Sequence, residues 1–178
     1  YFPSVADTIA KTVTLTVTAA GNSPCTTVNR SIAVTINPVP VVNAGTDATV
    51  CQGSNTNLNG SVLHASGGIW TTSGTGTFAP DQNNPAATYI PSPADTTAGS
   101  ITLTLTSTGM GTCNPVSDQK IITFHKIPFS YAGIDDSICA DASSYTLNGK
   151  ILNSTGGTWS SSGTGGFFPS ANSINSMY

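Results

Sequence analysis

The sequence predicts an all-β protein built from a repeated unit, and three observations carry that prediction. Thr, Ser and Asn supply 64 of the 178 residues, whereas Glu is absent and Lys plus Arg total 5. Glu, Lys and Arg are among the strongest helix formers, so few segments favour a helix. The 18 Gly and 11 Pro favour turns between short strands. The third observation is an internal repeat, which is described next.

The repeat appears when the chain is shifted along itself by 88 positions. Of the first 40 residues, 16 are then identical to their partners, including Thr14–Thr18 on Thr102–Thr106 and Cys25 on Cys113. One inserted residue near Ser143 raises the offset to 89, which brings Trp70 onto Trp159. A fixed period of this length indicates a tandem array of like domains.

Proline-marked segments divide the array. Two short segments follow stretches of alternating apolar and polar residues, as linkers between domains do: Asn37–Pro40 and Lys126–Pro128. We therefore expect residues 1–38 to be the C-terminal part of a first repeat, 39–127 a complete repeat, and 128–178 the N-terminal part of a third. We also expect the parent protein to be longer.

Within the complete repeat, the pattern predicts an antiparallel β-sandwich of short strands. The expected strands, in order, span residues 41–50, 55–63, 68–72, 76–79, 87–90, 100–107 and 116–125. The clearest is the sixth, where Ile101, Leu103 and Leu105 alternate with threonines, so that one face is buried and the other solvated. Gly74–Thr75–Gly76 is expected to be a turn with positive φ at glycine.

The core is predicted from the large apolar residues of these strands. They are Leu58, Trp70, Phe78, Tyr89, Leu103, Leu105, Ile122 and Phe124, with Trp159 as the tryptophan of the third repeat. Burying each contributes about 1.5 to 3 kcal/mol, which together offsets the ordering of a domain of this size.

Charge excludes several functions. Only 7% of residues are charged and the net charge is −3, so the chain offers no basic surface for nucleic acid. Apolar runs extend over only a few residues, and we expect no membrane insertion of this segment. Threonine-rich strand faces then provide the solvated surface.

Each repeat carries two cysteines at the same phase, that is, at the same positions within the repeat. They predict a disulfide rather than a metal site, because the sequence has no C-x-x-C motif. One possibility joins Cys51 to Cys113, with Cys25 and Cys139 paired outside this sequence. The alternative is that cysteines of adjoining repeats meet across the junction, since the two positions could lie at opposite ends of a sandwich. Either bond implies an oxidising, extracellular setting.

Catalytic and metal sites are not expected. His64 and His125 are the only histidines and neither recurs with the period, so we predict no hydrolytic triad. Two acids recur with the period, Asp7 as Asp95 and Asp47 as Asp135, and they are too few for calcium, which takes six to eight oxygen ligands. We expect them in turns, and we expect no cofactor.

Three phrases carry a family resemblance: NAGTDATVCQGSNTNLNGSV, GGIWTTSGTGTFAP and YIPSPADTTAGSITLTLTSTGMGTCNPVSDQKIITF. They resemble tandem repeats of giant cell-surface adhesins of Bacteroidetes, including those of the gliding-motility type. The resemblance covers essentially the whole chain. It implies Ig-like or PKD-like β-sandwich repeats, type IX secretion, and no enzyme activity. It also implies O-glycosylation at Asp-Ser/Thr motifs, here Thr8, Thr96 and Ser137.

The leading hypothesis is a structural stalk on the cell surface, giving an adhesive tip reach and mechanical strength in adhesion or gliding. Its partners would be neighbouring repeats and other filament chains. A glycan- or surface-binding module is an alternative that predicts exposed aromatic residues recurring with the period. A second alternative is a self-assembling extracellular filament subunit in which one chain completes the sandwich of the next.

Overall fold

The computed structural model describes residues 1–111 and 113–178. Nearly all of its regular structure is β, which confirms the predicted fold class. The described residues form two short helices, α1 (Val5–Ala10) and α2 (Pro93–Ala98). The chain separates into two compact units, Tyr1–Phe124 and His125–Tyr178.

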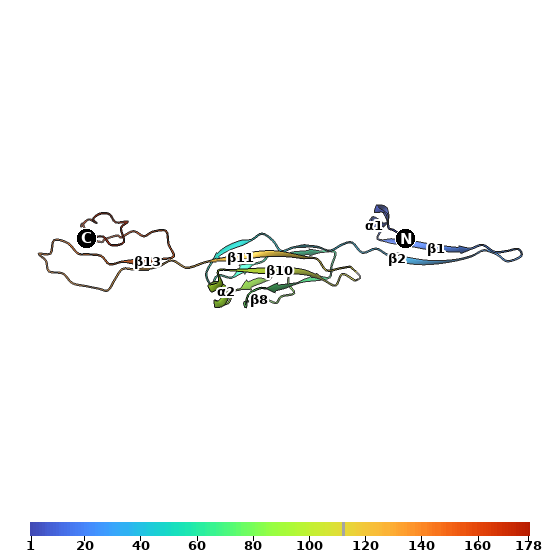
Figure 1. Cartoon of the computed structure of the whole chain (residues 1–178), viewed down its shortest axis with the longest axis horizontal. Helices are drawn as coiled ribbons and strands as arrows, with labels where there is room; N and C mark the ends of the chain where they lie inside the picture. The colour runs from blue at the N-terminus through green and yellow to red at the C-terminus, as the bar shows by residue number, and fades with distance from the viewer. Residues whose placement is uncertain (112) are drawn as a thin grey trace. The chain divides into compact units, whose positions relative to one another are not determined.

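The first unit opens with α1 and an antiparallel hairpin, β1 (Thr12–Ala19) and β2 (Val28–Thr35), shown in blue in Figure 1. Val13 and Leu15 alternate with threonines, as the sequence predicts for a strand with one apolar face. That face is largely open, with Val17 69% and Ile32 64% exposed. The apolar face of the hairpin is therefore exposed.

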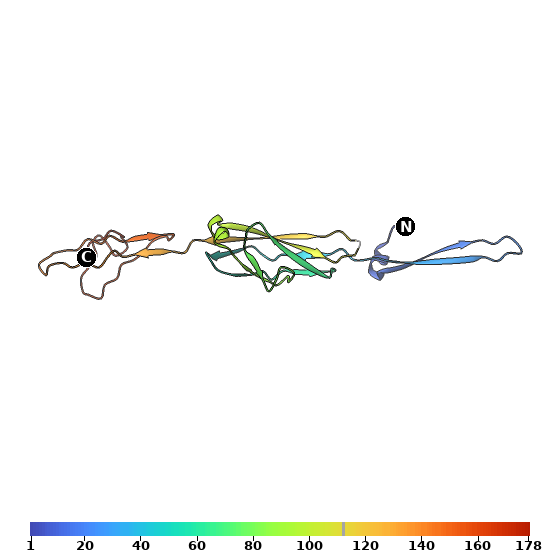
Figure 2. The ribbon, with the colours of Figure 1, turned by 90° about the horizontal axis from the view of Figure 1, so that it is seen from below.

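The complete repeat is a two-layer sandwich (Figure 2). One layer is a sheet of order β4-β11-β10-β7, and the other consists of the pair β3-β6 and the three-stranded sheet β5-β9-β8. The strands are β3 (Val41–Asn43), β4 (Ala48–Cys51), β5 (Thr56–Asn57), β6 (Ser61–Leu63), β7 (Gly67–Thr72), β8 (Thr77–Ala79), β9 (Thr88–Ile90), β10 (Ser100–Thr108) and β11 (Ser117–His125).

Two predicted strands are each divided in the structure. The expected strand 41–50 breaks into β3 and β4 at Gly45, whose φ of +81° lies in the left-handed region. The expected strand 55–63 breaks into β5 and β6 at Asn59, which has φ 52°. Left-handed backbone ends a ladder at both places. At Gly45 the chain passes from the layer of β3 to that of β4, and at Asn59 it passes from the pairing of β5 with β9 to the pairing of β6 with β3.

Strand β4 runs alongside β11 in the same direction. The amide of Ala44 donates to Asp118 Oδ2 at 2.8 Å, and Asp47 Oδ1 accepts from the amide of Ile121 at 2.8 Å. Both contacts advance together along the chain, so β4 continues beside the second half of β11. Cys51, at the end of β4, is therefore at the His125 end of the sandwich.

The core lies between the layers. Its fully buried large side chains include Leu58, Trp70, Tyr89, Leu103, Leu105 and Ile122, and Phe124 is 6% exposed. Phe78 packs on their edge and stacks near Trp70 with a ring-centroid distance of 6.5 Å. In β10, every second residue from Ile101 to Ser107 is buried, which is the expected period of two.

Helix α2 was not anticipated by the strand pattern. Ser92 caps it, because its hydroxyl accepts from the amide of Asp95 while the Asp95 carboxylate accepts from the amide of Ser92. Pro93 occupies the first turn, and Gly99 ends the helix with φ 85°. These are helix start and stop signals that the sequence already contained.

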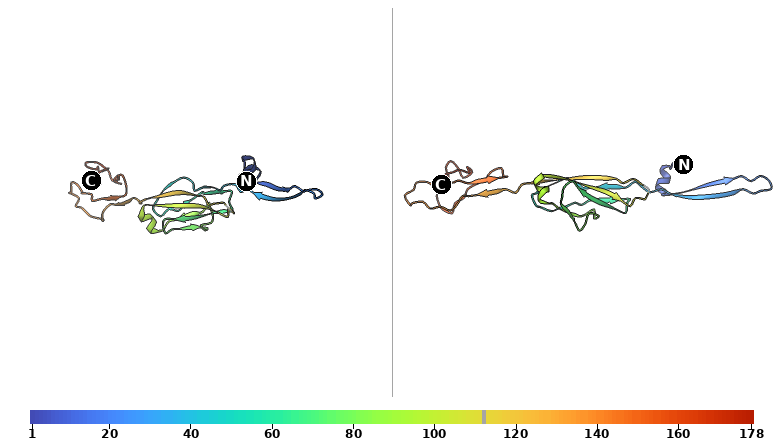
Figure 3. Two further views of the ribbon diagram at one scale, coloured as in Figure 1. Left: turned by 45° about the vertical axis from the view of Figure 1, so that its right-hand side comes forward. Right: turned by 60° about the horizontal axis from the view of Figure 1, so that its bottom comes forward.

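The second unit repeats the beginning of the sandwich. Strands β12 (Phe129–Tyr131) and β13 (Lys150–Leu152), drawn in orange in the right-hand view of Figure 3, pair in the register of β3 and β6. The indole of Trp159 donates to Ile174 O at 3.2 Å, as Trp70 donates to Pro85 O at 3.1 Å. The internal repeat is thus structural as well as sequential.

Candidate functional site

The densest polar site of the complete repeat is the buried carboxylate of Asp95. It is 2% exposed and accepts from the amide of Thr75 at 2.8 Å and from the hydroxyl of Tyr89 at 2.8 Å, besides its bond to the Ser92 amide. One side chain thereby joins α2, β9 and the loop after β7. Its neighbours are all hydrogen-bond donors of the same chain, so the arrangement is a structural tie.

The glycines around this carboxylate have a different role from the one predicted. Gly74 and Gly76 do not have positive φ. A Cβ on Gly74 would collide with Asp95, and one on Gly76 would lie 2.6 Å from Tyr89 Cζ. The predicted positive-φ turn is therefore wrong, and both glycines are needed because two other segments approach their backbone closely.

Ionisation of this site follows from its contacts. Burial by itself raises the pKa of Asp95, but hydrogen bonds from the amides of Ser92 and Thr75 and from Tyr89 hold that pKa below its ordinary value. Burial raises the pKa of Tyr89, and the adjacent carboxylate adds to that effect. At neutral pH the pair is therefore a phenol donating to a carboxylate.

Lys120 is a second buried polar group. It is 5% exposed, and its ammonium donates to Leu58 O at 3.2 Å. Burial lowers the pKa of Lys120, and the charge of Asp47 opposes that shift. The first repeat carries Ile32 at this phase, so the ammonium is not part of the repeat's shared design.

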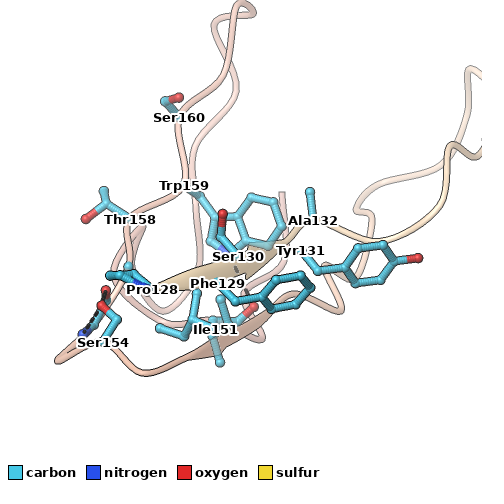
Figure 4. A pocket seen from close by; sticks show the side chains of 13 residues that line it. Pro128, Phe129, Ser130, Tyr131, Ala132, Ile151, Ser154, Thr158, Trp159 and Ser160 are labelled. Atoms are coloured by element: carbon cyan, nitrogen blue, oxygen red, sulfur yellow. Dashed lines mark hydrogen bonds between the residues drawn. The ribbon is translucent and has the colours of Figure 1, made fainter. Parts of the chain in front are cut away.

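The second unit carries an open groove of about 410 Å³ with a mixed polar and apolar lining (Figure 4). Trp159, Ile151 and Ser130 line it, at the phases of Trp70, Val62 and Val42, which pack in the complete core. Trp159 is only partly buried, in contrast to Trp70. A second hollow of about 280 Å³ lies beside Ile138 and Tyr178.

These hollows correspond to strands that the complete repeat possesses. In that repeat Leu105 of β10 packs against Trp70, and its methyl carbons lie 2.9 and 3.0 Å from the Cβ positions that Gly60 and Gly68 lack. The strands equivalent to β10 and β11 would fall after Tyr178 in the repeat. The groove therefore lies at the position that β10 and β11 cover in the complete repeat.

The cysteines are free thiols in the structure. Cys51 is at the His125 end of the sandwich, close to Gln52, whose amide lies 3.5 Å from Thr96 of α2. Cys113 is at the other end, before β11, with its sulfur 3.9 Å from Asn37 O. The nine residues of β11 span about 26 Å, which is eight steps of about 3.3 Å, and a disulfide needs Cα atoms within about 7 Å.

The predicted Cys51–Cys113 disulfide is therefore not supported. Its physical obstacle is the length of the sandwich, since the two cysteines mark opposite ends. Cys25 and Cys139 are exposed in their own units. Pairing of cysteines across a junction between repeats stays a prediction.

The three candidate glycosylation residues differ in accessibility. Thr8 and Ser137 are exposed. Thr96 is 6% exposed, and its hydroxyl donates to Pro93 O at 2.9 Å. The folded complete repeat thus does not present Thr96, which corrects that expectation. Thr8 and Ser137 stay predictions.

His64 and His125 are both exposed, and His64 has φ 59° in the loop after β6. In the described part of the chain, no three His, Cys or acidic side chains gather as metal ligands would. Nor does that part hold a helix of the length and apolarity that a bilayer crossing needs.

Sequence reasoning missed the roles of Asp95 and Lys120. Asp95 was expected to serve a turn through its own downstream amides, whereas it accepts from three different segments. The spacing Ser92-x-x-Asp95, which recurs as Ser4-x-x-Asp7, is a capping-box signal that identifies the helix. Lys120 gave no signal, since its counterpart is apolar.

No protein-family model matches the chain, and no curated protein matches it either. Among solved structures, the chain is similar to protocadherin gammaB7 in the structure of its EC3-6 cis-dimer, at 12% sequence identity and a TM-score of 0.42. The match covers 96% of this chain and 51% of the protocadherin chain, so this chain spans about half of that length.

Proposed function

We propose that the chain is a load-bearing spacer, a stalk segment of a secreted cell-surface adhesin that separates adhesive elements from the cell. The supporting observation is the position of the two connections of the complete repeat. The incoming segment lies beside Cys113 at one end, and β11 leaves at His125 at the other. A sandwich connected at opposite ends extends a chain and places each domain in series under tension.

The surface composition fits this role. The solvent-facing positions of β10 are threonines, and few charges are available to attract other macromolecules. We propose an extracellular location and no catalytic activity. The adhesin family and gliding role rest on the resemblance described above.

A glycan-binding module finds less support. Such sites stack sugars on exposed aromatic rings, and this hypothesis predicts their recurrence. Among the described residues of the complete repeat, the large hydrophobic side chains that are exposed are aliphatic: Val39, Val41, Leu63, Ile90, Ile121 and Ile127. Of the aromatic residues at recurring positions, Trp70 and Tyr89 are fully buried and Phe78 is partly buried against the core.

Single-molecule pulling on the 178-residue chain, held at its two ends, tests the stalk. We expect one discrete unfolding event as residues Val41 to His125 are released, with a contour length of about 300 Å at about 3.6 Å per residue. The unfolding of the complete repeat should appear as a force peak that stands above the thermal noise of the measurement. Smooth extension without a discrete event would contradict a load-bearing role.

A further inference from the structure

Asn59 combines a chemically labile sequence with a protected position. It is followed by Gly60, and an Asn-Gly pair is especially prone to deamidation, because glycine has no Cβ to hinder attack of its amide nitrogen on the asparagine side chain. The side chain of Asn59 is exposed, so water reaches it. Its two neighbours along the chain, in contrast, are held by the interior of the complete repeat.

The fold itself requires this pair. The backbone of Asn59 is left-handed, with φ 52°, a conformation that glycine and asparagine adopt more readily than other residues. Gly60 lies against the indole of Trp70, where an added Cβ would be 2.7 Å from Cζ2. The pair recurs in the second unit as Asn148 and Gly149. The labile pair thus belongs to the packing of the repeat.

Hydrogen bonds hold both sides of Asn59. The amide of Leu58 donates to Ala87 O at 2.9 Å, and the amide of Gly60 donates to Pro85 O at 3.0 Å. Deamidation begins when the Gly60 nitrogen approaches Asn59 Cγ, which requires rotation about the bond between Cα and C of Asn59. That rotation would break the hydrogen bond to Pro85 and move Gly60 away from the indole on which it packs. The folded repeat therefore opposes the reaction.

We propose that Asn59 is a modification site that becomes reactive when the complete repeat unfolds. In the unfolded chain, the Gly60 nitrogen bonds to Asn59 Cγ, the bond from Cγ to Nδ2 breaks, and ammonia leaves with the amide proton. Water then opens the resulting succinimide ring at one of its two carbonyl carbons. The product is aspartate, or isoaspartate in which the main chain runs through Cγ. The inference concerns any unfolding of this repeat and does not depend on the stalk function.

Isoaspartate lengthens the main chain by one carbon, and the folded repeat has no room for it. Leu58 is 0% exposed and its carbonyl accepts from Lys120 at 3.2 Å, so Leu58 cannot shift without loss of core contacts. Gly60 is confined by Trp70 and Pro85. The extra carbon therefore leaves at least one of the two flanking hydrogen bonds unmade, and buried polar groups without partners are costly. An aspartate with an unchanged main chain would fit the exposed position.

The test uses the 178-residue chain with Asn148→Gln, which leaves Asn59–Gly60 as the remaining Asn-Gly pair. The protein is incubated at mildly alkaline pH, once folded and once in urea above its unfolding transition. Isoaspartate is quantified by enzymatic methylation and peptide mass spectrometry. We expect modification to be about 10-fold slower or more in the folded protein, because the reaction then needs opening of core structure. Equal rates in the two states would overturn the proposal.

Two controls accompany this measurement. A peptide of residues 56–62, incubated in both solvents, corrects for the effect of urea on the reaction itself. Asn57 is the control within the chain, because it is followed by Leu58, whose side chain hinders the attack. Modification of Asn57 as fast as that of Asn59 in urea would contradict the assigned site.

Refolding tests the consequence of the modification. After incubation in urea and dilution, the refolded fraction is measured by tryptophan fluorescence, and it should fall in step with the amount of isoaspartate. Asn59→Gly is the control, because glycine adopts φ 52° and carries no side-chain amide, so its refolded fraction should not fall with incubation.

Asn59→Asp separates the effect of charge from that of main-chain length. It adds the same negative charge and leaves the main chain unchanged, so freshly purified Asn59→Asp should refold like the background protein. Poor refolding of this variant, equal to that of the isoaspartate form, would overturn the proposal. Isoaspartate-containing chains that refold with unchanged stability would overturn it as well.

Discussion

At the scale of single residues, Asp95 shows how a charge-poor domain uses one carboxylate. The chain has 8 acidic residues, and this one receives donors from three segments while 2% exposed. Hydrogen bonds to a charged group are stronger than those between neutral groups, and leaving them unpaired in the interior is costly. Asp95 therefore stabilises the position of α2 against the sandwich.

We expect Asp95→Asn to destabilise the complete repeat by about 1.5 to 3 kcal/mol at pH 7, because the amide cannot accept from all its donors. The lowered pKa of Asp95 means that its contribution is complete above the ordinary aspartate value near 4 and is lost as pH falls through the folded-state value. Urea denaturation followed by tryptophan fluorescence at pH 7 and pH 3 measures this. The difference between the variant and the natural chain should shrink at pH 3.

Asp81→Asn is the matched control. Asp81 is exposed and accepts from the amide of Asn83 at 2.7 Å, a bond that an asparagine oxygen can also accept. Its stability should stay within about 0.5 kcal/mol of the natural chain. Equal losses for both variants would refute a special role for Asp95.

Lys120→Ile tests the other buried group. Because Ile32 occupies this phase in the first repeat, we expect a change of about 1 kcal/mol or less at pH 7, since burying an ammonium offsets its hydrogen bond. The pKa of Lys120 is lowered, so the protonated form costs stability below its folded-state pKa, and stability rises as pH increases from there towards the ordinary value near 10.4. The variant should lack that alkaline rise. A loss of about 3 kcal/mol or more would show that the ammonium is essential.

At the scale of elements, glycines at fixed positions in the repeat let neighbouring backbone lie against the tryptophan of β7. A Cβ on Gly60 would lie 2.7 Å from Trp70 Cζ2 and 2.8 Å from Pro85 O, and Gly149 faces Trp159 in the same way at 2.6 Å. Backbone on one side and a buried indole on the other leave little room for relaxation. The conserved spacing of glycine and tryptophan within this chain is thus a packing requirement.

Gly60→Ala should lower the free energy of unfolding by about 1 to 3 kcal/mol through overpacking. Gly67→Ala is the control on β7, where the added carbon meets Thr108 Oγ1 at an ordinary 3.5 Å. Thermal unfolding monitored by circular dichroism compares them. Similar melting temperatures for the two variants would contradict the packing explanation.

The elements also show where sequence reasoning succeeds and where it stops. Alternation in β10 located its buried face, because a period of two follows from strand geometry alone. Two strands are divided because Gly45 and Asn59 adopt left-handed backbone. Glycine and asparagine tolerate that conformation but do not require it, so the residue types alone do not predict the breaks. The role of Asp95 depends on which segments meet around its carboxylate, and the separation of Cys51 from Cys113 depends on the order of the strands. Neither can be predicted from a single segment of the sequence.

At the scale of the whole molecule, no disulfide within residues 1–111 and 113–178 joins one end of the sandwich to the other. Cys51 and Cys113 mark opposite ends, and hydrophobic packing and hydrogen bonds must hold the complete repeat. The domain has a buried tryptophan and a full set of aliphatic partners, which suffices for a domain of this size.

Reductant should therefore leave the melting temperature of this chain unchanged. Thiol titration of the freshly unfolded protein should find all four cysteines reactive, in agreement with free thiols. Differential scanning calorimetry with and without dithiothreitol measures the first point. A drop of several degrees in reductant would indicate an internal disulfide and contradict this placement of Cys51 and Cys113.

The parallel course of β4 and β11 has a mechanical consequence. When the ends of the repeat are pulled apart, these neighbouring strands slide past one another along their length, so their hydrogen bonds are loaded in shear and must break together. Strands pulled apart at right angles would instead unzip one bond at a time at low force. The first strands to meet the load are thus those arranged to resist it longest.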